Sequence, residues 1–358
     1  MVMQLSPPTG KPFQGTGQGH DRRLHPRRGA RARANLWRLE VSIGALALVV
    51  VTVALTVWPN VSPPRRMPAG LELVHSGVAM ADPFATPQPN RDLMDHYVFN
   101  GSAAPGVGWV SATDEGLNVG VRAHRSWSGW FAVTLHAAGP DVVWHALMSR
   151  PSTPVGSGVG EAVLAVQSAS TQRNGSINYV VVSALSSQGK STWEIGSAHG
   201  FVADAVTDRL WQEPLRVDAP STEPVTIRTD GHHSLTVWFG NRQVYSSHTL
   251  HMNDPAPFQA YLEVQGRGIA YVSNFKGFWV ADAAPVTVEG APPGAHLTLG
   301  TAGGAVHATA DAAGRAALHV PSPDLVGTGT LTVTGRSGVR HFSDLHYAGG
   351  DVVQITGR

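Results

Sequence analysis

The sequence predicts a mainly β protein: an antiparallel jelly-roll-type β-sandwich and a second, smaller β-sandwich, preceded by one transmembrane helix. Short apolar runs bounded by Gly, Pro, Asn, Asp or Ser recur throughout residues 92–283, a pattern typical of sandwich strands. An uncharged apolar run near the N-terminus predicts the helix. The 358 residues contain no cysteine, so the fold must rest on the burial of apolar side chains.

Residues 1–36 are expected to form a disordered basic tail. They are rich in Pro, Gly, Gln and Arg and show no apolar periodicity, so they cannot bury enough surface to become ordered. Arginines can bind nucleic acid. Here they gather between Arg22 and Arg38, directly before the apolar run, which favours contact with anionic lipid instead. No nucleic-acid partner is therefore expected.

Residues 37–58 are predicted to be an uncleaved transmembrane signal anchor. The run from Val41 to Trp58 carries no charge, and a helix of that length spans about 27 Å, close to a bilayer core. A buried core helix would show a polar face, and a cleaved signal would have a shorter apolar region with a nearby cleavage site. The arginines before the run place the N-terminus in the cytoplasm and residues 59–358 outside the cell membrane.

Residues 59–91 are expected to be a Pro-rich linker. The segments "PNVSPPRRMPAG" and "DPFATPQPN" contain proline at short intervals, which favours an extended and stiff chain. This linker would hold the folded part away from the bilayer.

Residues 92–283 are predicted to form the larger sandwich. None of this span shows a convincing 3.6-residue stripe, and its apolar runs are short and regularly spaced, which favours antiparallel strands. The expected strands include "GLNVGV", "WFAVTLH", "VVWHALM", "EAVLAVQSA", "NYVVVSAL", "VTIRT", "SLTVWF", "QAYLEV" and "FKGFWV".

Residues 284–358 are predicted to form a separate β domain with small side chains. Phe342 and Tyr347 are its large aromatic residues. The segments "GAPPGAHLTL" and "ADAAGRAALHV" resemble the Ig-like or carboxypeptidase-regulatory-like modules of bacterial surface proteins. The resemblance implies a small Ig-like sandwich.

The stretch "VTIRTDGHHSLTVWFGNRQVYSS", residues 225–247, is predicted to be a meander of three short strands. Asp230-Gly231 and Gly240-Asn241 supply the turn residues that tight hairpins require. Leu235, Val237 and Phe239 share one strand face because side chains alternate along a strand.

This meander, followed by "PFQAYLEVQGRGIAYVSNFKGFWV", resembles the concanavalin A-like lectin/glucanase superfamily, including laminin-G-like domains. The upstream segments "DEGLNVGV" and "NYVVVSAL" fit strands of the same family. The resemblance covers about 190 residues and implies a lectin-like sandwich that binds glycan. Fold alone does not decide between binding and catalysis.

The catalytic signature of the glucanases in this superfamily is not found in the sequence. That signature resembles Glu-x-Asp-x-x-Glu along one strand, and the segment "WEIGSAHG" keeps Glu194 but has Gly196 where the second carboxylate belongs. Asp114 and Glu115 are adjacent and fit a turn. The seventeen histidines include His232-His233 and His248-Thr-Leu-His251, without the spacing of a zinc site. No cofactor is expected, although calcium stays an option.

Aromatic side chains on the outer strand faces are the predicted ligand contacts. If Phe131, Val133 and Leu135 point inward, the residues between them point outward, where indole rings can stack on sugars. The alternative is that these aromatic rings are core residues. The candidates are Trp127 and Trp193, placed on loops, together with Trp130, His136 and Trp238 on strands.

The sequence thus favours a membrane-anchored extracytoplasmic protein of the bacterial envelope that binds a cell-wall glycan or an envelope protein. Two alternatives stay open: a scaffolding module that contacts only proteins, and a hydrolase that acts on envelope polysaccharide. A concave face with aromatic and polar side chains would indicate binding, and paired carboxylates would indicate hydrolysis.

Overall fold

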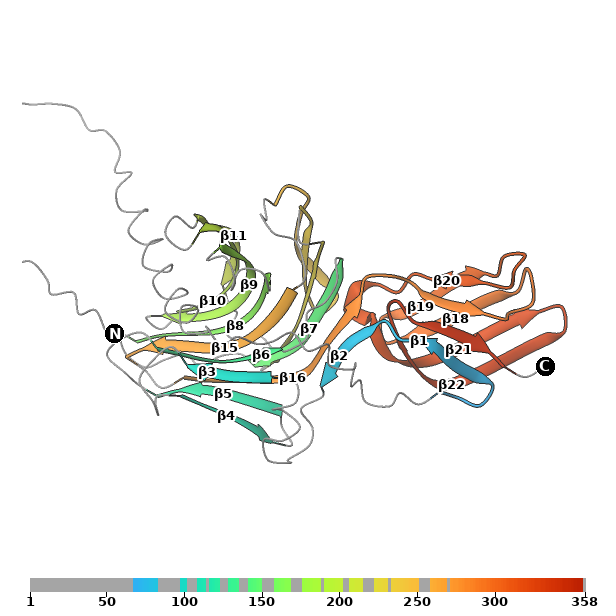
Figure 1. Cartoon of the computed structure of the whole chain (residues 1–358), viewed down its shortest axis with the longest axis horizontal. Helices are drawn as coiled ribbons and strands as arrows, with labels where there is room; N and C mark the ends of the chain where they lie inside the picture. Colours follow the sequence, from blue (N-terminus) through green and yellow to red (C-terminus); the bar gives the residue numbers. More distant parts are fainter. Residues whose placement is uncertain are drawn as a thin grey trace, which may run out of the picture.

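The computed structural model forms two β-sandwiches that lie end to end (Figure 1). The residues that it describes are 67–82, 97–101, 108–113, 116–122, 128–134, 141–149, 158–168, 176–187, 190–201, 206–214, 222–230, 233–250, 258–268 and 271–356. The tail and the apolar run predicted to cross the membrane lie outside these ranges. Within them, no helix is long and apolar enough to span a membrane.

The larger sandwich consists of a seven-stranded and an eight-stranded antiparallel sheet, so the predicted β-sandwich class is confirmed. The seven-stranded sheet has, in order, β11 (Val206–Pro214), β10 (Lys190–Phe201), β9 (Ser176–Ser187), β8 (Val159–Ser168), β15 (Phe258–Arg267), β6 (Ser128–Thr134) and β3 (Tyr97–Gly101). The eight-stranded sheet has β14 (Arg242–Ser247), β13 (Leu235–Phe239), β12 (Thr222–Thr229), β7 (Val142–Ser149), β16 (Tyr271–Asp282), β5 (Gly116–Val121) and β4 (Gly108–Thr113), with β2 (Val78–Asp82) paired to β16.

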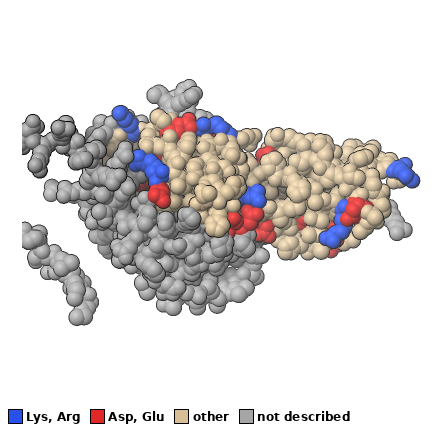
Figure 2. Space-filling view, turned by 90° about the horizontal axis from the view of Figure 1, so that it is seen from above, with Lys and Arg blue, Asp and Glu red and all other residues tan. Residues whose placement is uncertain are grey.

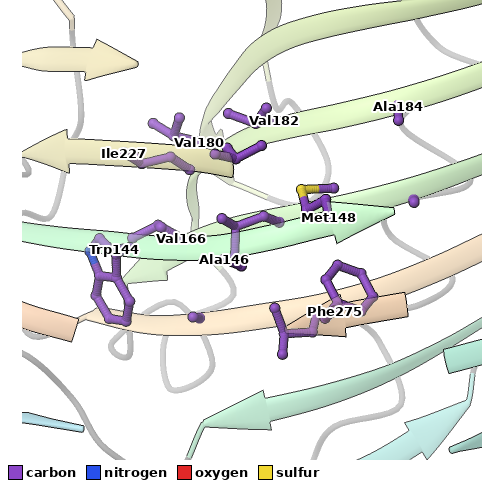
Figure 3. Packing of buried hydrophobic residues seen from close by; sticks show 14 of the residues in the cluster. Trp144, Ala146, Met148, Val166, Val180, Val182, Ala184, Ile227 and Phe275 are labelled. Carbon is purple, nitrogen blue, oxygen red and sulfur yellow. The ribbon is translucent and has the colours of Figure 1, made fainter. Parts of the chain in front are cut away.

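The main core lies between these two sheets and follows the period of two along each strand. Trp144, Ala146 and Met148 of β7 alternate into it and face Val180 and Val182 of β9 across the sandwich (Figure 3). Burying apolar surface in this way stabilises the fold by roughly 25 cal/mol per Å².

The predicted meander is confirmed as β12, β13 and β14. Leu235, Val237 and Phe239 are buried in the core, as the alternation predicted. Gly240, at the turn between β13 and β14, has a φ of 54°, a conformation that favours glycine.

The second sandwich packs two four-stranded sheets around its own core. One sheet has β1 (Leu71–His75), β23 (Val352–Ile355), β17 (Val286–Glu289) and β20 (Ala316–Leu318). The other has β19 (Gly304–Thr309), β18 (His296–Thr301), β21 (Val326–Gly335) and β22 (Gly338–Ala348), and a short 3-10 helix spans Ser322–Asp324. Phe342 and Tyr347 are buried in this core.

Residues 71–82, expected to be part of an extended linker, instead form strands in both sandwiches. β1 pairs with β23 of the second sandwich, and β2 pairs with β16 of the larger one. Between them, the Gly77 amide donates to the buried carboxylate of Asp351 at 2.9 Å. Segment 71–82 therefore fastens the two sandwiches together, a long-range pairing that a local count of prolines does not reveal.

Candidate functional site

The five aromatic candidates do not gather into one site among the described residues. Trp127 and His136 lie outside the described residues. Trp130 lies in β6, where it stands opposite Val264 of β15, a core residue. Phe131 stands opposite Glu263. The outward placement of the Trp130 side chain stays a prediction.

The placement of Trp193 on a loop is wrong. Trp193 lies within β10, is 5 % exposed and packs against Phe239 with ring centroids 4.9 Å apart. The strand is not evident from the sequence because its apolar alternation is limited to Trp193 and Ile195, followed by a buried Ser197 and by two glycines. Trp193 is a core residue of the larger sandwich.

Trp238 is half-buried on the outer face of the eight-stranded sheet, the face predicted for it. It heads a row that continues across adjacent strands through Thr226, His145 and Trp279. His145 Nδ1 lies 2.9 Å from Thr226 Oγ1, and its ring stacks on Trp279 at 5.0 Å and 11°. Burial lowers the pKa of His145 to about 4.

The far end of this row is closed by the second sandwich. Trp279 is 8 % exposed and belongs to the same cluster of buried side chains as Leu71, Val286 and Val353. Among the described residues, the Trp279 end of the row therefore lies in the contact between the two sandwiches, and Trp238 at the other end is half-buried.

A different set of polar side chains lies on the outer face of the seven-stranded sheet. Glu161 precedes the core residue Ala162, Glu194 stands between two core residues of β10, and Glu263 stands between Leu262 and Val264. Alternation therefore turns these glutamates away from the core. We call the group formed by Glu161, Ser183, Glu194, Glu263 and Gln265 the acidic face; Ser183, Glu194 and Gln265 are buried, and Glu161 and Glu263 are partly exposed.

The strand register brings Glu161 and Glu263 together. Glu263 pairs with Val163, and Glu161 pairs with Gln265, so the two glutamates are diagonal neighbours on β8 and β15. The Cα atoms of diagonal neighbours are typically about 7–8 Å apart, within reach of long side chains. Gln265 Nε2 donates to Glu161 Oε2 at 3.3 Å.

The Glu263 carboxyl group is the most unusual member of the acidic face. Its Oε1 is buried and has no hydrogen-bond partner among the described residues. Burial, with a smaller contribution from the negative charge of Glu161, raises the pKa of Glu263 to about 8. At neutral pH Glu263 is therefore mainly protonated.

Glu194 and an apolar group complete this surface. Glu194 is buried, pairs in register with Ser183 of β9 and lies 3.7 Å from the guanidinium of Arg209. On the same face, Tyr261 forms a small buried cluster with Val163 and Ala165. The acidic face thus combines carboxyl groups with an aromatic and aliphatic patch.

Sequence reasoning missed the acidic face because it looked for carboxylates spaced along one strand. The structure instead assembles them from β8, β10 and β15. A local signal was present: each glutamate interrupts an apolar run, as in "GEAVLAV", "TWEIG" and "YLEVQ". A charged residue inside a predicted strand marks an outward position, but only the pairing of strands shows which outward residues meet.

The described surface offers neither a metal cluster nor a dominant charge. Among the described residues, no group of three or more His, Cys, Asp or Glu side chains could hold a metal ion. On the view in Figure 2, most of the Lys and Arg side chains lie near Asp and Glu in small mixed groups, and one basic group stands apart at the right-hand tip. The described part of this view therefore shows no extended basic patch.

Comparisons with known proteins yield similarities of structure alone. No family model and no curated protein matches the sequence. The solved structures that are similar include LamAcat from Zobellia galactanivorans, with a TM-score of 0.42, 9 % identity and 57 % of this chain and 97 % of that chain covered.

Two further structures are similar at the same level. The catalytic domain of an endo-1,3-beta-glucanase (laminarinase) from Thermotoga petrophila has a TM-score of 0.43, 11 % identity and coverages of 59 % and 98 %. A carbohydrate binding module from Bacillus subtilis has a TM-score of 0.33, 12 % identity and coverages of 52 % and 98 %. At these scores the similarities carry no conclusion about ligand or activity.

Proposed function

We propose that this protein binds a glycan through the acidic face of its larger sandwich. The observation that carries the proposal is the juxtaposition of Glu161, Gln265 and Glu263, with an unsatisfied carboxyl oxygen, beside the apolar group of Tyr261. Ligand sites commonly combine an apolar lining with a few convergent polar groups.

The chemistry of the acidic face suits a sugar. A pyranose offers hydroxyl groups that donate hydrogen bonds to carboxylates, and a C–H face that packs on aromatic and aliphatic side chains. Ser183 lies between Val163 and Glu194 in the register and adds a hydroxyl that can both donate and accept.

The proposal includes the cellular setting predicted from the sequence. Residues 37–58 anchor the chain in the bacterial cell membrane, and the sandwiches lie outside, where cell-wall glycan or an envelope protein is the partner. The second sandwich serves as an Ig-like terminal module. The uncharged apolar run and the arginines before it support this setting.

Glycan-array binding by the full-length chain tests the proposal. We expect the substitutions Glu194→Gln and Glu263→Gln to weaken binding at least tenfold, since each changes one polar contact in a site that excludes water. Glu213→Gln is the matched control, because Glu213 pairs with Arg242 at a sheet edge away from the acidic face. Binding that is lost in Trp238→Ala but unchanged in both glutamine variants would move the site to the other sheet.

A scaffolding role without a sugar site predicts a different outcome. The full-length chain would then bind no glycan on the array and would instead retain envelope proteins in cross-linking experiments. The scaffolding role would also predict that Glu194→Gln and Glu263→Gln retain the same envelope proteins as the natural chain.

A second candidate function is hydrolysis of a glycosidic bond. One observation favours it: Glu161 and Glu263 are two carboxyl groups on one face, of which Glu263 holds its proton at neutral pH. The two glutamates thus lie on neighbouring strands of one sheet face, an arrangement in which an acid and a base could flank one glycosidic bond. Release of reducing ends from a bound polysaccharide, abolished by Glu161→Gln and by Glu263→Gln, tests this candidate.

A further inference from the structure

We propose that ligand binding at the acidic face releases the proton held by the Glu263 and Glu161 pair, so that the site selects ligands that donate hydrogen bonds and rejects anionic sugars. This inference rests on the proposed glycan-binding function. The expected ligands are neutral or cationic sugars, and their affinity for the acidic face should depend on pH.

Geometry assigns the proton of the pair to Glu263. Glu161 accepts a hydrogen bond from Gln265, which stabilises its charged form. The Oε1 atom of Glu263 is buried and finds no hydrogen-bond partner in the part of the chain that the structure describes, and an ionised carboxyl there would stand beside the charge of Glu161. Two neighbouring carboxyl groups in such unequal surroundings share one proton, and the less solvated one retains it.

The described strands around Glu263 bring few other charges to it. On β8 the charged residue is Glu161, and β6 contributes none within Ser128–Thr134. Arg267 lies on β15 itself, opposite Val159. β9 carries no charged residue, and β10 contributes Lys190 and Glu194, the latter beside Arg209 of β11.

A ligand hydroxyl group supplies the donor that Glu263 lacks. When the ligand hydroxyl donates a hydrogen bond to the carboxyl oxygen, the ionised form of Glu263 gains a partner, and the proton of the Glu263 carboxyl group passes to the buffer. An ammonium group of an amino sugar would have the same effect. A uronate or sulfate would instead place a second negative charge beside that of Glu161 and would oppose the ionisation of Glu263, which costs binding energy.

The sign of the pH dependence follows from this proton release. Because the complex holds fewer protons than the free protein and ligand, the association constant rises with pH. The rise is at most tenfold per pH unit and ends near the pKa of the free Glu263, about 8. Above that pH the association constant is level.

Isothermal titration calorimetry on the full-length chain tests the inference. The probes are neutral glucan, mannan and xylan oligosaccharides, the amino sugar chitosan trimer, and oligogalacturonate as the acidic probe. Titrations from pH 5 to 9, in buffers of different ionisation enthalpy, measure the association constant and the number of protons released.

We expect release of up to one proton for a neutral sugar, a smaller net release for the amino sugar because its amine takes up a proton beside the carboxyl groups, and no binding of oligogalacturonate. Glu263→Gln replaces a neutral acid by a neutral amide of the same shape, so the fold is retained while the pH dependence flattens. Glu213→Gln should leave the pH dependence as in the natural chain.

Three results would overturn the inference. Glycan binding that is independent of pH, or accompanied by proton uptake, refutes the proton release while the proposed function stands. Preferential binding of oligogalacturonate refutes the ligand class. Failure of every probe, and of a broad glycan array, removes the proposed function together with the inference.

Discussion

Asp351 is the residue whose replacement should most directly test how segment 71–82 fastens the two sandwiches. Its side chain is completely buried. Oδ1 accepts the Gly77 amide at 2.9 Å, and Oδ2 accepts the Ala348 amide at 2.7 Å. Substitution by alanine leaves both buried backbone donors without these acceptors.

The expected loss follows from these two bonds. Hydrogen bonds to a charged group contribute roughly 1.5–3 kcal/mol each, so Asp351→Ala should lower the free energy of unfolding by roughly 3–6 kcal/mol. Asp351→Asn retains one acceptor oxygen but turns its amide N–H donors toward the other backbone donor, so it should cost at least the loss of one of the two bonds. It is also the variant to use if Asp351→Ala fails to fold.

Asp311 provides a matched control within the same chain. It also accepts two backbone amides, from Ala313 and Arg315, each at 2.9 Å, but it lies in an exposed turn. Water can replace the carboxylate there, so Asp311→Ala should lower stability by only about 1 kcal/mol.

Urea unfolding of the full-length chain, followed by tryptophan fluorescence and circular dichroism, measures the three variants. Equal losses for Asp351→Ala and Asp311→Ala would refute the reasoning, because burial would then have no effect on the two bonds. A large loss confined to the second sandwich would show that the Gly77 bond does not couple the domains.

Three further predictions follow from the described contacts. In urea titrations, Trp193→Ala should lower the free energy of unfolding by roughly 3–5 kcal/mol, and Trp238→Ala by about 1–2 kcal/mol, because Trp193 is buried and Trp238 is half-buried. The reverse order of the two losses would show that the strand faces are exchanged. The pKa of His145 is about 4 when folded and about 6.5 when unfolded, so acid favours unfolding. Between pH 6.5 and pH 4, the free energy of unfolding of the natural chain should fall by up to about 3 kcal/mol more than that of His145→Gln. An equal fall with pH in both proteins would contradict this. Gly77→Ala should lower the free energy of unfolding by roughly 3 kcal/mol or more, because the added methyl group would overlap backbone atoms of the second sandwich. Gly300→Ala is the control: its methyl group would have 3.8 Å of clearance, so stability should change by less than about 1 kcal/mol. Similar melting temperatures for the two variants would argue against a tight junction.

The sequence by itself determined the β class, most strands of the larger sandwich and the inward face of β13. These features depend on the period of two and on turn residues, which are local. Leu235, Val237 and Phe239 alternate with polar or amphipathic neighbours, and Gly240 marks the turn, so short-range information was enough.

Only the tertiary structure decided which strands lie side by side. β10 carries Trp193 inward although its apolar alternation is short, and residues 71–75 pair with residues 352–355, far away along the chain. Such pairings depend on long-range packing and register, and a sequence pattern leaves them open because many registers preserve the same alternation.

The candidate site shows the same division. Glu161 and Glu263 are about a hundred positions apart, and each could be assigned from its strand to an outer face. Their meeting depends on β8 and β15 being neighbours in a register that places Glu263 opposite Val163. A slip of one residue would turn Glu263 into the core, where an ionisable group without a partner is strongly destabilising. Burial of the flanking Leu262 and Val264 holds that register, so packing of the core, more than the glutamates themselves, brings the two carboxyl groups together.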